Sequence, residues 1–370
     1  MQPVFFDPAK ESLEDFKTRV HPEKTIDAYA TELKELFLIR NPRFRFDPNY
    51  QDELATFLNE HFFGKSPTET GSWVFFPWNA TLVHYLPKEM HEELRTARNK
   101  NLITKDEQEK FYNAKIGVAG LSVGSHVALT IAMMGGCRLM KLADPDELSG
   151  SNLNRIRGDF TGLGEKKIDL VSRQIYQMNP YAEIHDYPEG VNEENIGEFM
   201  NSLDIIVDEL DNFEMKIRLR LEAKKRRIPL IMATDNGDNV ICDIERYDLD
   251  ENFKIFNGAL GDFGLADLAK TPPADFPKIA SRIAGPELVV PRMMASVMEV
   301  GKTLYSWPQL GDAATLSGVV VAYLTRKIAL GEEIKSGKLE VNLDKIFCTG
   351  EFLAGEETDK KKYLEMMGLE

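Results

Sequence analysis

The chain has little cysteine. Three of its 370 residues are cysteines, and Cys137, Cys242 and Cys348 are far apart and form no Cys-x-x-Cys pair. The segment that begins at Met1 has no basic stretch, and its apolar run is too short for a secretory signal peptide. Disulfide frameworks belong to oxidising compartments and use even sets of cysteines. We therefore expect three reduced thiols in a cytoplasmic protein.

Positive charge in excess and long apolar runs are also missing. The formal net charge is −15, whereas a nucleic-acid-binding protein presents a basic surface to the phosphates. No nucleic-acid partner is therefore expected. The longest apolar stretch, residues 316–329, is interrupted by Arg326 and Lys327 and falls short of the roughly 20 residues of a membrane span. We expect a buried helix there and no membrane partner.

The length and the hydrophobic content of 43% are those of a globular protein with one large or two ordinary domains. Residues 1–90 predict a small N-terminal α+β module with helices at 25–37 and 51–62 and two strands within 73–85. Residues 91–350 are expected to form the main domain. Residues 351–370 are predicted to be a charged, mobile C-terminal tail.

The main domain alternates predicted strands and helices, which is the pattern of a parallel sheet covered by helices. Residues 238–247 alternate apolar and polar side chains, as expected of an antiparallel strand with one face in water. Residues 250–312 are rich in glycine and proline, and an irregular stretch of this length is usually functional. The predicted parallel strands are 116–119, 139–143, 183–186, 203–207 and 229–234, followed by a helix at 313–330 and a strand at 338–347.

A glycine-containing turn follows the first parallel strand. Residues 120–125 read Gly-Leu-Ser-Val-Gly-Ser and lead into a helix, and Asp144 ends the second strand. In βαβ units of this kind, phosphates meet the N–H groups of the helix N-terminus, and an acid about 20 residues further on accepts from ribose hydroxyls. The turn predicts a nucleotide-binding site. By itself it allows NAD as well as ATP.

Four short motifs follow in a fixed order. They are Asp144-Pro-Asp146, Ser151-Asn152-Leu153-Asn154-Arg155, Gly164-Glu-Lys-Lys167 and Asp211-Asn212. This order resembles the ThiF/MoeB family of adenylating enzymes, which is related to the ubiquitin-activating enzymes. The resemblance extends from about residue 94 to residue 347. It implies an α/β fold with a Rossmann-like, mostly parallel sheet that antiparallel strands continue.

The resemblance also implies an activity. Such adenylyltransferases use ATP and Mg²⁺ to activate a carboxylate as an acyl-adenylate and release pyrophosphate. The substrate would be a small acid or the C-terminus of a peptide or protein, such as a ubiquitin-like or sulfur-carrier protein. The chemistry needs positioned cations and a carboxylate for the metal, because the departing pyrophosphate carries several negative charges.

The matching residues receive the family's roles. Asp211 would hold Mg²⁺, Asn152 would donate to a phosphate oxygen and Asp144 would hold the ribose. The implied catalytic residues are Arg98, Asn152, Arg155, Lys167 and Asp211, and the implied nucleotide-binding residues are Gly120, Ser122, Gly124, Ser125, Asp144, Asp146 and Asn212.

Arg98 lies upstream of the first strand in the segment Arg95-Thr-Ala-Arg98-Asn99. The family has Arg-x-x-Arg-Gln there, and its second arginine reaches the triphosphate of the neighbouring subunit. The resemblance therefore implies a two-fold homodimer in which each Arg98 completes the partner's site. The residue types alone allow a solvated helix face equally well.

The sequence departs from the family pattern in two places. Ser122 and Ser125 stand where relatives have glycine, so we expect weaker nucleotide binding, because a side chain hinders the close approach of a phosphate. Many relatives hold zinc with two Cys-x-x-Cys pairs, and no such structural zinc is expected here. The sequence most resembles a bacterial branch with some members fused to nitroreductase-like domains; nothing after residue 347 is expected to form one.

Two other functions fit part of the pattern. A non-catalytic scaffold would keep the nucleotide fold as a binding module, which the altered turn permits. An NAD-dependent oxidoreductase would use the turn and Asp144 but leaves Lys167 and Asp211 unexplained. Relatives that form thioesters or persulfides carry a cysteine in the region matching residues 250–312, and this chain has none there. We therefore expect no transfer of the acyl group to a protein thiol.

Overall fold

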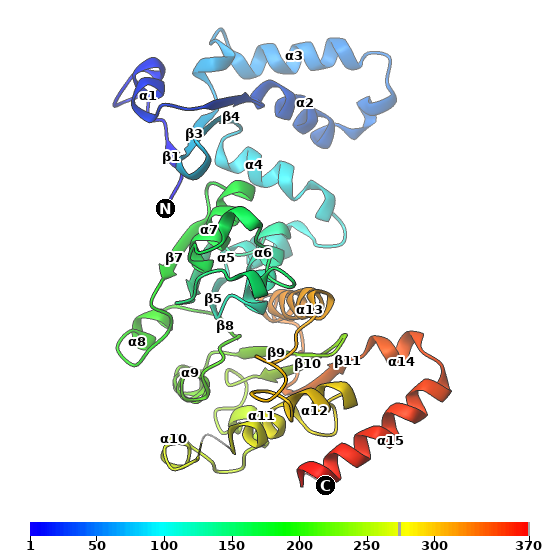
Figure 1. The fold of residues 1–370 in the computed structure, drawn as a ribbon. Coiled ribbons are helices and arrows are strands. Elements are labelled where there is room, and N and C mark those ends of the chain that lie inside the picture. The colour runs from blue at the N-terminus through cyan, green and yellow to red at the C-terminus, as the bar shows by residue number, and fades with distance from the viewer. Residues whose placement is uncertain (273–274, 369–370) are drawn as a thin grey trace. The chain divides into compact units, whose positions relative to one another are not determined.

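The computed structural model describes residues 1–272 and 275–368, which form two compact units (Figure 1). The first unit comprises residues 1–109 and 172–182, and the second comprises the remainder. The first unit extends beyond the predicted boundary at residue 90 because α4 (Lys88–Arg95) belongs to its core. Met90 and Leu94 of this helix pack against the cluster formed by Tyr29, Leu33, Leu36 and Leu86.

The first unit is built on a four-stranded sheet in the order β1-β3-β4-β2. The predicted strand pair and the helix at 51–62 are confirmed. The helix predicted at 25–37 is wrong in its first part, because Thr25 and Ile26 belong to a strand that pairs in parallel with β4. The elements are β1 (Val4–Phe5), α1 (Leu13–Val20), β2 (Lys24–Asp27), α2 (Tyr29–Arg40), α3 (Tyr50–Phe62), β3 (Ser72–Phe76) and β4 (Thr81–Tyr85).

The second unit contains a seven-stranded sheet in the order β11-β10-β9-β8-β5-β6-β7. Strands β9, β8, β5, β6 and β7 are parallel, and β10 and β11 continue the sheet antiparallel. This confirms the predicted fold class. The strands are β5 (Lys115–Ala119), β6 (Leu139–Ala143), β7 (Glu183–Tyr187), β8 (Ile205–Asp208), β9 (Leu230–Asn236), β10 (Asn239–Glu245) and β11 (Gly337–Val341).

Two helices form the most closely packed part of the second unit. Helix α13 (Gly311–Ala329) packs against β8, β9, β10 and α6 (Val123–Met133). A Cβ atom at Gly318 would lie 2.3 Å from the Cβ atom of His126, so the close approach requires glycine. The remaining helices of this part of the chain are α5 (Lys105–Asn113), α7 (Lys167–Met178), α8 (Ile196–Phe199) and α9 (Phe213–Arg226).

Strand β10 has no face in water, contrary to the prediction. All seven of its residues are buried. Its polar residues alternate as predicted, but Asp243 pairs with Lys338 and Glu245 pairs with Arg220. Period-two polarity therefore arises here from ion pairs inside the protein and not from exposure to solvent.

The C-terminal part of the chain is more regular than predicted. Residues 250–312, of which 273 and 274 lie outside the described residues, contain helices α10 (Leu265–Leu268), α11 (Phe276–Ala284) and α12 (Pro291–Val297). The predicted strand 338–347 ends at Val341, because Asn342 caps the helix α14 (Leu343–Phe347) by accepting from the N–H of Lys345.

Residues 350–367 form a helix, α15 (Gly350–Met367), where a mobile tail was predicted. Tyr363, Leu364 and Met367 recur at helical spacing and pack against the buried cluster of Ile241, Val289 and Met294. The charged residues between them obscure this short apolar stripe in the sequence. Within the described ranges, no helix has both the length and the apolar character needed to cross a bilayer.

Candidate nucleotide site

A cavity of about 570 Å³ lies in the second unit and is lined from the β5–α6 turn, the ends of β8 and β9, and helices α9, α11 and α12. Carboxyl ends of parallel strands meet at one edge of a sheet, where ligands of such folds bind. The structure brings six predicted residues to this cavity: Ser122, Asp146, Asn152, Arg155, Lys167 and Asp211.

The glycine turn is shaped by packing. Gly120 has a φ of +89°, and a Cβ atom there would lie 2.2 Å from the carbonyl oxygen of Glu209. At Gly124 a Cβ atom would lie 2.9 Å from the Val118 side chain. The turn therefore needs both glycines in order to pack against its neighbouring strands.

The two serines of the turn have different environments. Ser125 is fully buried, and its hydroxyl donates to the carbonyl oxygen of Ser122 over 2.8 Å. Ser122 lines the cavity at the N-terminus of α6, and its buried hydroxyl has no hydrogen-bond partner in the described part of the chain. Of the two serines, Ser122 is the one that lines the cavity.

Asp144 and Asp146 also divide their roles. Asp144 is buried, and its carboxylate accepts from the N–H groups of Leu121 (2.6 Å) and Asp146 (2.8 Å). Burial raises the pKa of Asp144. Asp144 thus fixes the two loops and does not line the cavity, whereas Asp146 does. Of the two acids, Asp146 is therefore the one whose side chain faces the cavity.

Lys167 and Asp146 form an ion pair at the cavity wall. The Lys167 Nζ lies 2.7 Å from an Asp146 carboxylate oxygen, and the lysine side chain is 7% exposed. The N–H of Lys167 also donates to the Asp146 carbonyl oxygen over 2.9 Å. A lysine held in this way is a positioned cation.

Asn152 and Arg155 are supplied by the loop between β6 and α7. Arg155 Nη1 donates to the Ser151 carbonyl oxygen (3.1 Å) and the Asn154 side chain (3.0 Å), while its buried Nε has no partner among the described residues. The carbonyl oxygen of Arg155 accepts from His126 Nε2. Burial lowers the pKa of His126, which keeps this imidazole neutral at pH 7.

Asp211 and Asn212 precede α9 and have separate tasks. Asn212 caps the helix, because its side-chain oxygen accepts from the N–H of Met215 over 3.0 Å. Asp211 is exposed and lines the cavity. No three His, Cys, Asp or Glu side chains in residues 1–272 and 275–368 cluster as a metal site. One carboxylate nevertheless fits Mg²⁺, which is usually held by one or two carboxylates together with substrate phosphates.

Three charged residues of the cavity were missed in the sequence: Glu209, Lys216 and Asp235. Glu209 accepts from the N–H of Ala233 over 3.0 Å, and burial raises its pKa well above the ordinary value. Asp235 accepts from Ser317 (2.8 Å) and Gln309 (3.1 Å), and burial raises its pKa too. Glu209 and Lys216 flank the Asp211-Asn212 motif in sequence, and this proximity is the signal that could have identified them as residues of the cavity.

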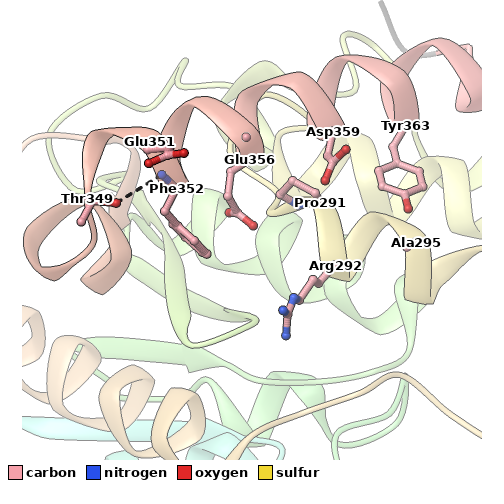
Figure 2. Close-up of a pocket in the computed structure, with 10 residues that line it drawn as sticks. Pro291, Arg292, Ala295, Thr349, Glu351, Phe352, Glu356, Asp359 and Tyr363 are labelled. Atoms are coloured by element: carbon pink, nitrogen blue, oxygen red, sulfur yellow. Dashed lines mark hydrogen bonds between the residues drawn. The ribbon is translucent and has the colours of Figure 1, made fainter.

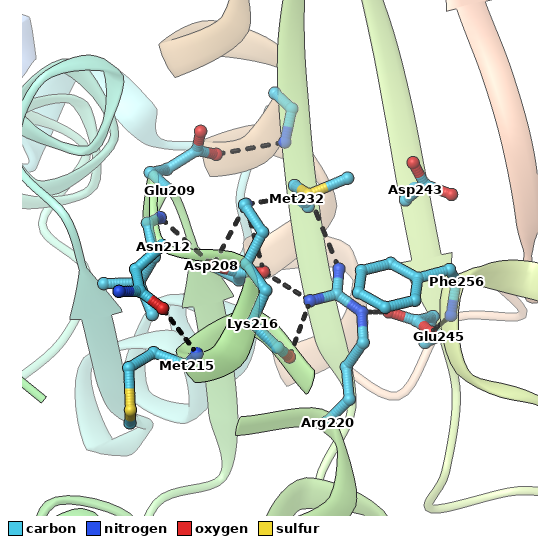
Figure 3. Close-up of polar contacts among 12 residues, drawn as sticks. Asp208, Glu209, Asn212, Met215, Lys216, Arg220, Met232, Asp243, Glu245 and Phe256 are labelled. Atoms are coloured by element: carbon cyan, nitrogen blue, oxygen red, sulfur yellow. Dashed lines mark hydrogen bonds and ion pairs between the residues drawn. The ribbon is translucent and has the colours of Figure 1, made fainter. Parts of the chain in front are cut away.

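A buried ionic network lies next to the cavity (Figure 3). Lys216 Nζ lies 3.3 Å from both carboxylate oxygens of Asp208. Arg220, from the same helix, pairs with Asp208 and with Glu245 and places its guanidinium 3.9 Å from the ring centre of Phe256. The positive charges of Lys216 and Arg220 keep the pKa of Asp208 below its usual value despite burial. The network fixes β8, β10 and α9 to one another.

A second cavity, of about 550 Å³, lies between α12 and α15 (Figure 2). Its charged lining residues are Arg292, Glu351, Glu356 and Asp359, and it contains none of the predicted site residues.

Arg98, the remaining predicted catalytic residue, is exposed on a short 3₁₀ turn (Ala97–Asn99) of the first unit.

The thiols have no nucleophilic environment. Cys137 and Cys242 are buried, which raises the pKa of Cys137 to about 12 and that of Cys242 further. Cys348 is exposed, and its pKa is also raised, with a hydrogen bond to Asp344 contributing. A thiolate is the reactive form of cysteine, so none of the three is activated.

The ThiF family model matches residues 96–238. An uncharacterized protein of Mycobacterium tuberculosis, MT1398, is 34% identical over 276 residues, which are 74% of this chain and 38% of that protein. The tRNA threonylcarbamoyladenosine dehydratase of Bacillus subtilis is 31% identical over 46% of this chain and 70% of its own length. The molybdopterin-synthase adenylyltransferase of Haemophilus influenzae is 30% identical over 38% and 59%. The chain thus spans less than half the length of the mycobacterial relative.

Proposed function

Because this chain belongs to the ThiF family, we propose that it is an adenylyltransferase that uses ATP to activate a carboxylate as an acyl-adenylate and releases pyrophosphate. The observation that carries this proposal is the cavity, where Ser122, Asn152, Arg155, Lys167 and Asp211 lie around one space. An anion with several charges needs such a set of donors and cations.

The roles follow from the contacts of each side chain. Ser122 and the N-terminus of α6 meet phosphate oxygens, and Arg155, which lines the same cavity, supplies positive charge to them. Lys167 neutralises charge that builds up on the leaving pyrophosphate. Asp146 accepts from a ribose hydroxyl. Asp211 holds Mg²⁺, which supplies positive charge to the phosphates when it is bound.

The activated acyl group is not passed to a cysteine of this chain. Two of the three thiols are buried, and the pKa of each thiol is raised. We propose that the protein works in the cytoplasm with these thiols reduced and that its acceptor comes from outside the chain. A variant with all three cysteines changed to serine should still form the acyl-adenylate if it folds.

The first test compares nucleotides by isothermal titration calorimetry. ATP–Mg should bind and NAD should not, and Lys167→Ala should weaken ATP–Mg binding. Lys166→Ala is the matched control, because Lys166 is the neighbouring lysine but bonds to the Pro188 carbonyl oxygen at the surface. NAD binding in place of ATP would refute the proposal. ATP binding without pyrophosphate exchange across a broad carboxylate panel would favour a non-catalytic scaffold.

We also propose a two-fold homodimer in which Arg98 completes the site of the partner subunit. A guanidinium is permanently charged and bonds two phosphate oxygens at once, and Arg98 is exposed. Arg98→Ala and Asp211→Ala should each be inactive alone. When equal amounts of the two variants exchange subunits at random, each mixed dimer has one intact site, so roughly a quarter of all sites in the mixture should regain activity. Mixed dimers that form but stay inactive would show that Arg98 does not act across subunits.

A further inference from the structure

The cavity has two chemically different ends. One end is polar and carries the predicted nucleotide residues Ser122, Asp146, Asn152, Arg155 and Lys167. The other end is apolar and comes from α11, α12 and the segment that follows α12. Its apolar lining residues are Ala280, Ile283, Ala284, Val289, Met293, Val297, Trp307 and Pro308, and the same elements also contribute Ser281, Ser306 and Gln309. Glu209, Lys216 and Asp235 also line the cavity.

The apolar end is a wall with space in front of it. Ile283, Val289 and Val297 are buried, at 5%, 7% and 9% exposed. Ala280 and Ala284 lie one helical turn apart on α11 and present only methyl groups to the cavity. Small side chains among larger apolar ones leave room for an apolar ligand group.

The segment before α13 is fastened beside this wall. The Gln309 side chain donates to Asp235 over 3.1 Å, and the Gln309 carbonyl oxygen accepts from Asn154 over 2.8 Å. These bonds connect the segment to β9 and to the loop that carries Arg155. Trp307, two residues earlier, lines the cavity and remains 42% exposed. An indole at this place is free to cover an apolar group that enters the cavity.

The order of the strands separates the two ends. Asp146 follows β6, whereas the apolar wall lies over β9 and β10, and β5 and β8 stand between them in the sheet. With the ribose at Asp146 and the phosphates at Ser122 and Arg155, the apolar end is left for the carboxylate substrate, whose oxygen must reach the α-phosphorus on the side opposite the leaving pyrophosphate.

We propose that the apolar end of the cavity binds the hydrocarbon part of the substrate, so that the activated carboxylate belongs to an acid with an extended apolar chain. This inference rests on the proposed adenylyltransferase function and names its substrate class. A glycine-terminated peptide has no side chain to place against the wall and would leave it in contact with water. A hydrocarbon chain removes that surface from water, which is favourable in proportion to the area buried.

The experiment uses acyl-adenylate mimics, in which an acyl group is joined to adenosine through a sulfamate. The series contains acetyl, butanoyl, hexanoyl and octanoyl compounds and a glycylglycyl compound, and affinities for the full chain are measured by calorimetry. Each added methylene should strengthen binding about fourfold, the equivalent of ~0.8 kcal/mol. The hexanoyl compound should therefore bind roughly a hundredfold or more tighter than the acetyl compound, and the glycylglycyl compound should bind no tighter than acetyl.

Variants of the lining residues locate the binding site of the hydrocarbon chain. Ala284→Phe and, separately, Ala280→Phe fill the space in front of the apolar wall. In each variant, the increase in affinity with acyl-chain length should stop at a shorter acyl group. The acetyl compound should still bind, which also shows that the variant is folded. Trp307→Ala should reduce the gain without abolishing acetyl binding. Ala266→Phe on α10 is the control, because Ala266 is exposed, and it should leave the whole series unchanged.

The outcomes separate the inference from the function on which it rests. Binding of every compound with equal affinity, or preference for the glycylglycyl compound, would overturn the apolar substrate and leave the adenylyltransferase intact. Failure of all compounds to bind, acetyl included, would overturn both. A chain-length gain that Ala284→Phe and Ala280→Phe leave intact would place the hydrocarbon elsewhere and would also overturn the inference.

Discussion

The polar and the apolar end of the cavity differ in how the chain builds them. The polar end comes from short motifs directly after parallel strands, so the residues that share a task are near one another in sequence. The apolar end comes from α11, α12 and the segment around Trp307, which the fold brings over β9 and β10. Groups that act on phosphate charge recur in recognisable motifs. A wall that binds hydrocarbon needs only apolar side chains of suitable size, and many residue types meet that requirement.

The largest effect should come from the network that supports both ends. Arg220→Met leaves Glu245 buried without its cation and Asp208 with Lys216 alone, so the free energy of unfolding should fall by about 3–5 kcal/mol. Urea denaturation measures it. Arg226→Met on the same helix breaks a partly exposed pair with Glu222 and an exposed hydrogen bond to the Gly197 carbonyl oxygen, and it should cost about 0–1 kcal/mol. Equal losses would show that Arg220 has no special structural role.

Asp211 and Asn212 test the polar end, because the structure gives neighbouring residues opposite tasks. Asp211→Ala should lower the rate of adenylation by about 10²–10³-fold and leave stability unchanged. Asn212→Ala removes the cap of α9 and should lower the free energy of unfolding by about 1 kcal/mol. Pyrophosphate exchange and denaturation on both variants check this. If the Asp211→Ala variant kept full pyrophosphate exchange, Asp211 would not be part of the catalytic site.

Gly120 tests the turn between β5 and α6, which packs against the segment that follows β8. Gly120→Ala combines a φ of +89° with a contact of 2.2 Å to the Glu209 carbonyl oxygen. Gly164→Ala is matched to it, because its φ is +83° and no atom lies within 4 Å of the added methyl group. Gly164→Ala should cost about 1–2 kcal/mol from backbone strain alone, and Gly120→Ala should cost more. Equal melting temperatures of the two variants would contradict the packing role.

Glu209 should give the smallest effect, visible only as a difference between pH values. Burial raises its pKa in the folded state, so the folded protein favours the protonated carboxyl group. Its contribution to stability is present at pH values below the unfolded pKa and is lost as the pH rises toward the folded pKa. Glu209→Gln keeps an oxygen for the Ala233 N–H and stays neutral. The free energy of unfolding, measured at pH 5 and at pH 8, should rise for the variant relative to the natural chain as the pH rises.

Much of the second unit was predictable from the sequence. The five parallel strands lie within a few residues of their predicted positions, and four of them, β5, β6, β8 and β9, are short apolar runs ended by glycine or acidic residues. Predictions failed where a local pattern had two physical causes. Residues 25–27 have helical periodicity but pair with β4, and the charged C-terminal residues form α15 because a few apolar side chains find a partner surface.

The candidate site shows the same division. The sequence indicated Ser122, Asp146, Asn152, Arg155, Lys167 and Asp211, which line the cavity. It did not separate Asp146 from Asp144 or Asp211 from Asn212, because only backbone geometry decides which carboxylate or amide oxygen is consumed by N–H groups. It gave no role to Glu209 or Asp235, whose pKa values depend on burial.

The sequence by itself determined the order of the five parallel strands, the family and the motifs of the candidate site, because these depend on local periodicity and on residues at fixed spacing. The tertiary structure alone decided that β10 is buried on both faces, that Arg220 neutralises carboxylates from two strands, and that α11 and α12 place an apolar wall beside a polar site. Each of these depends on segments far apart in the chain. Their contacts are set by packing and burial, and no local pattern encodes them.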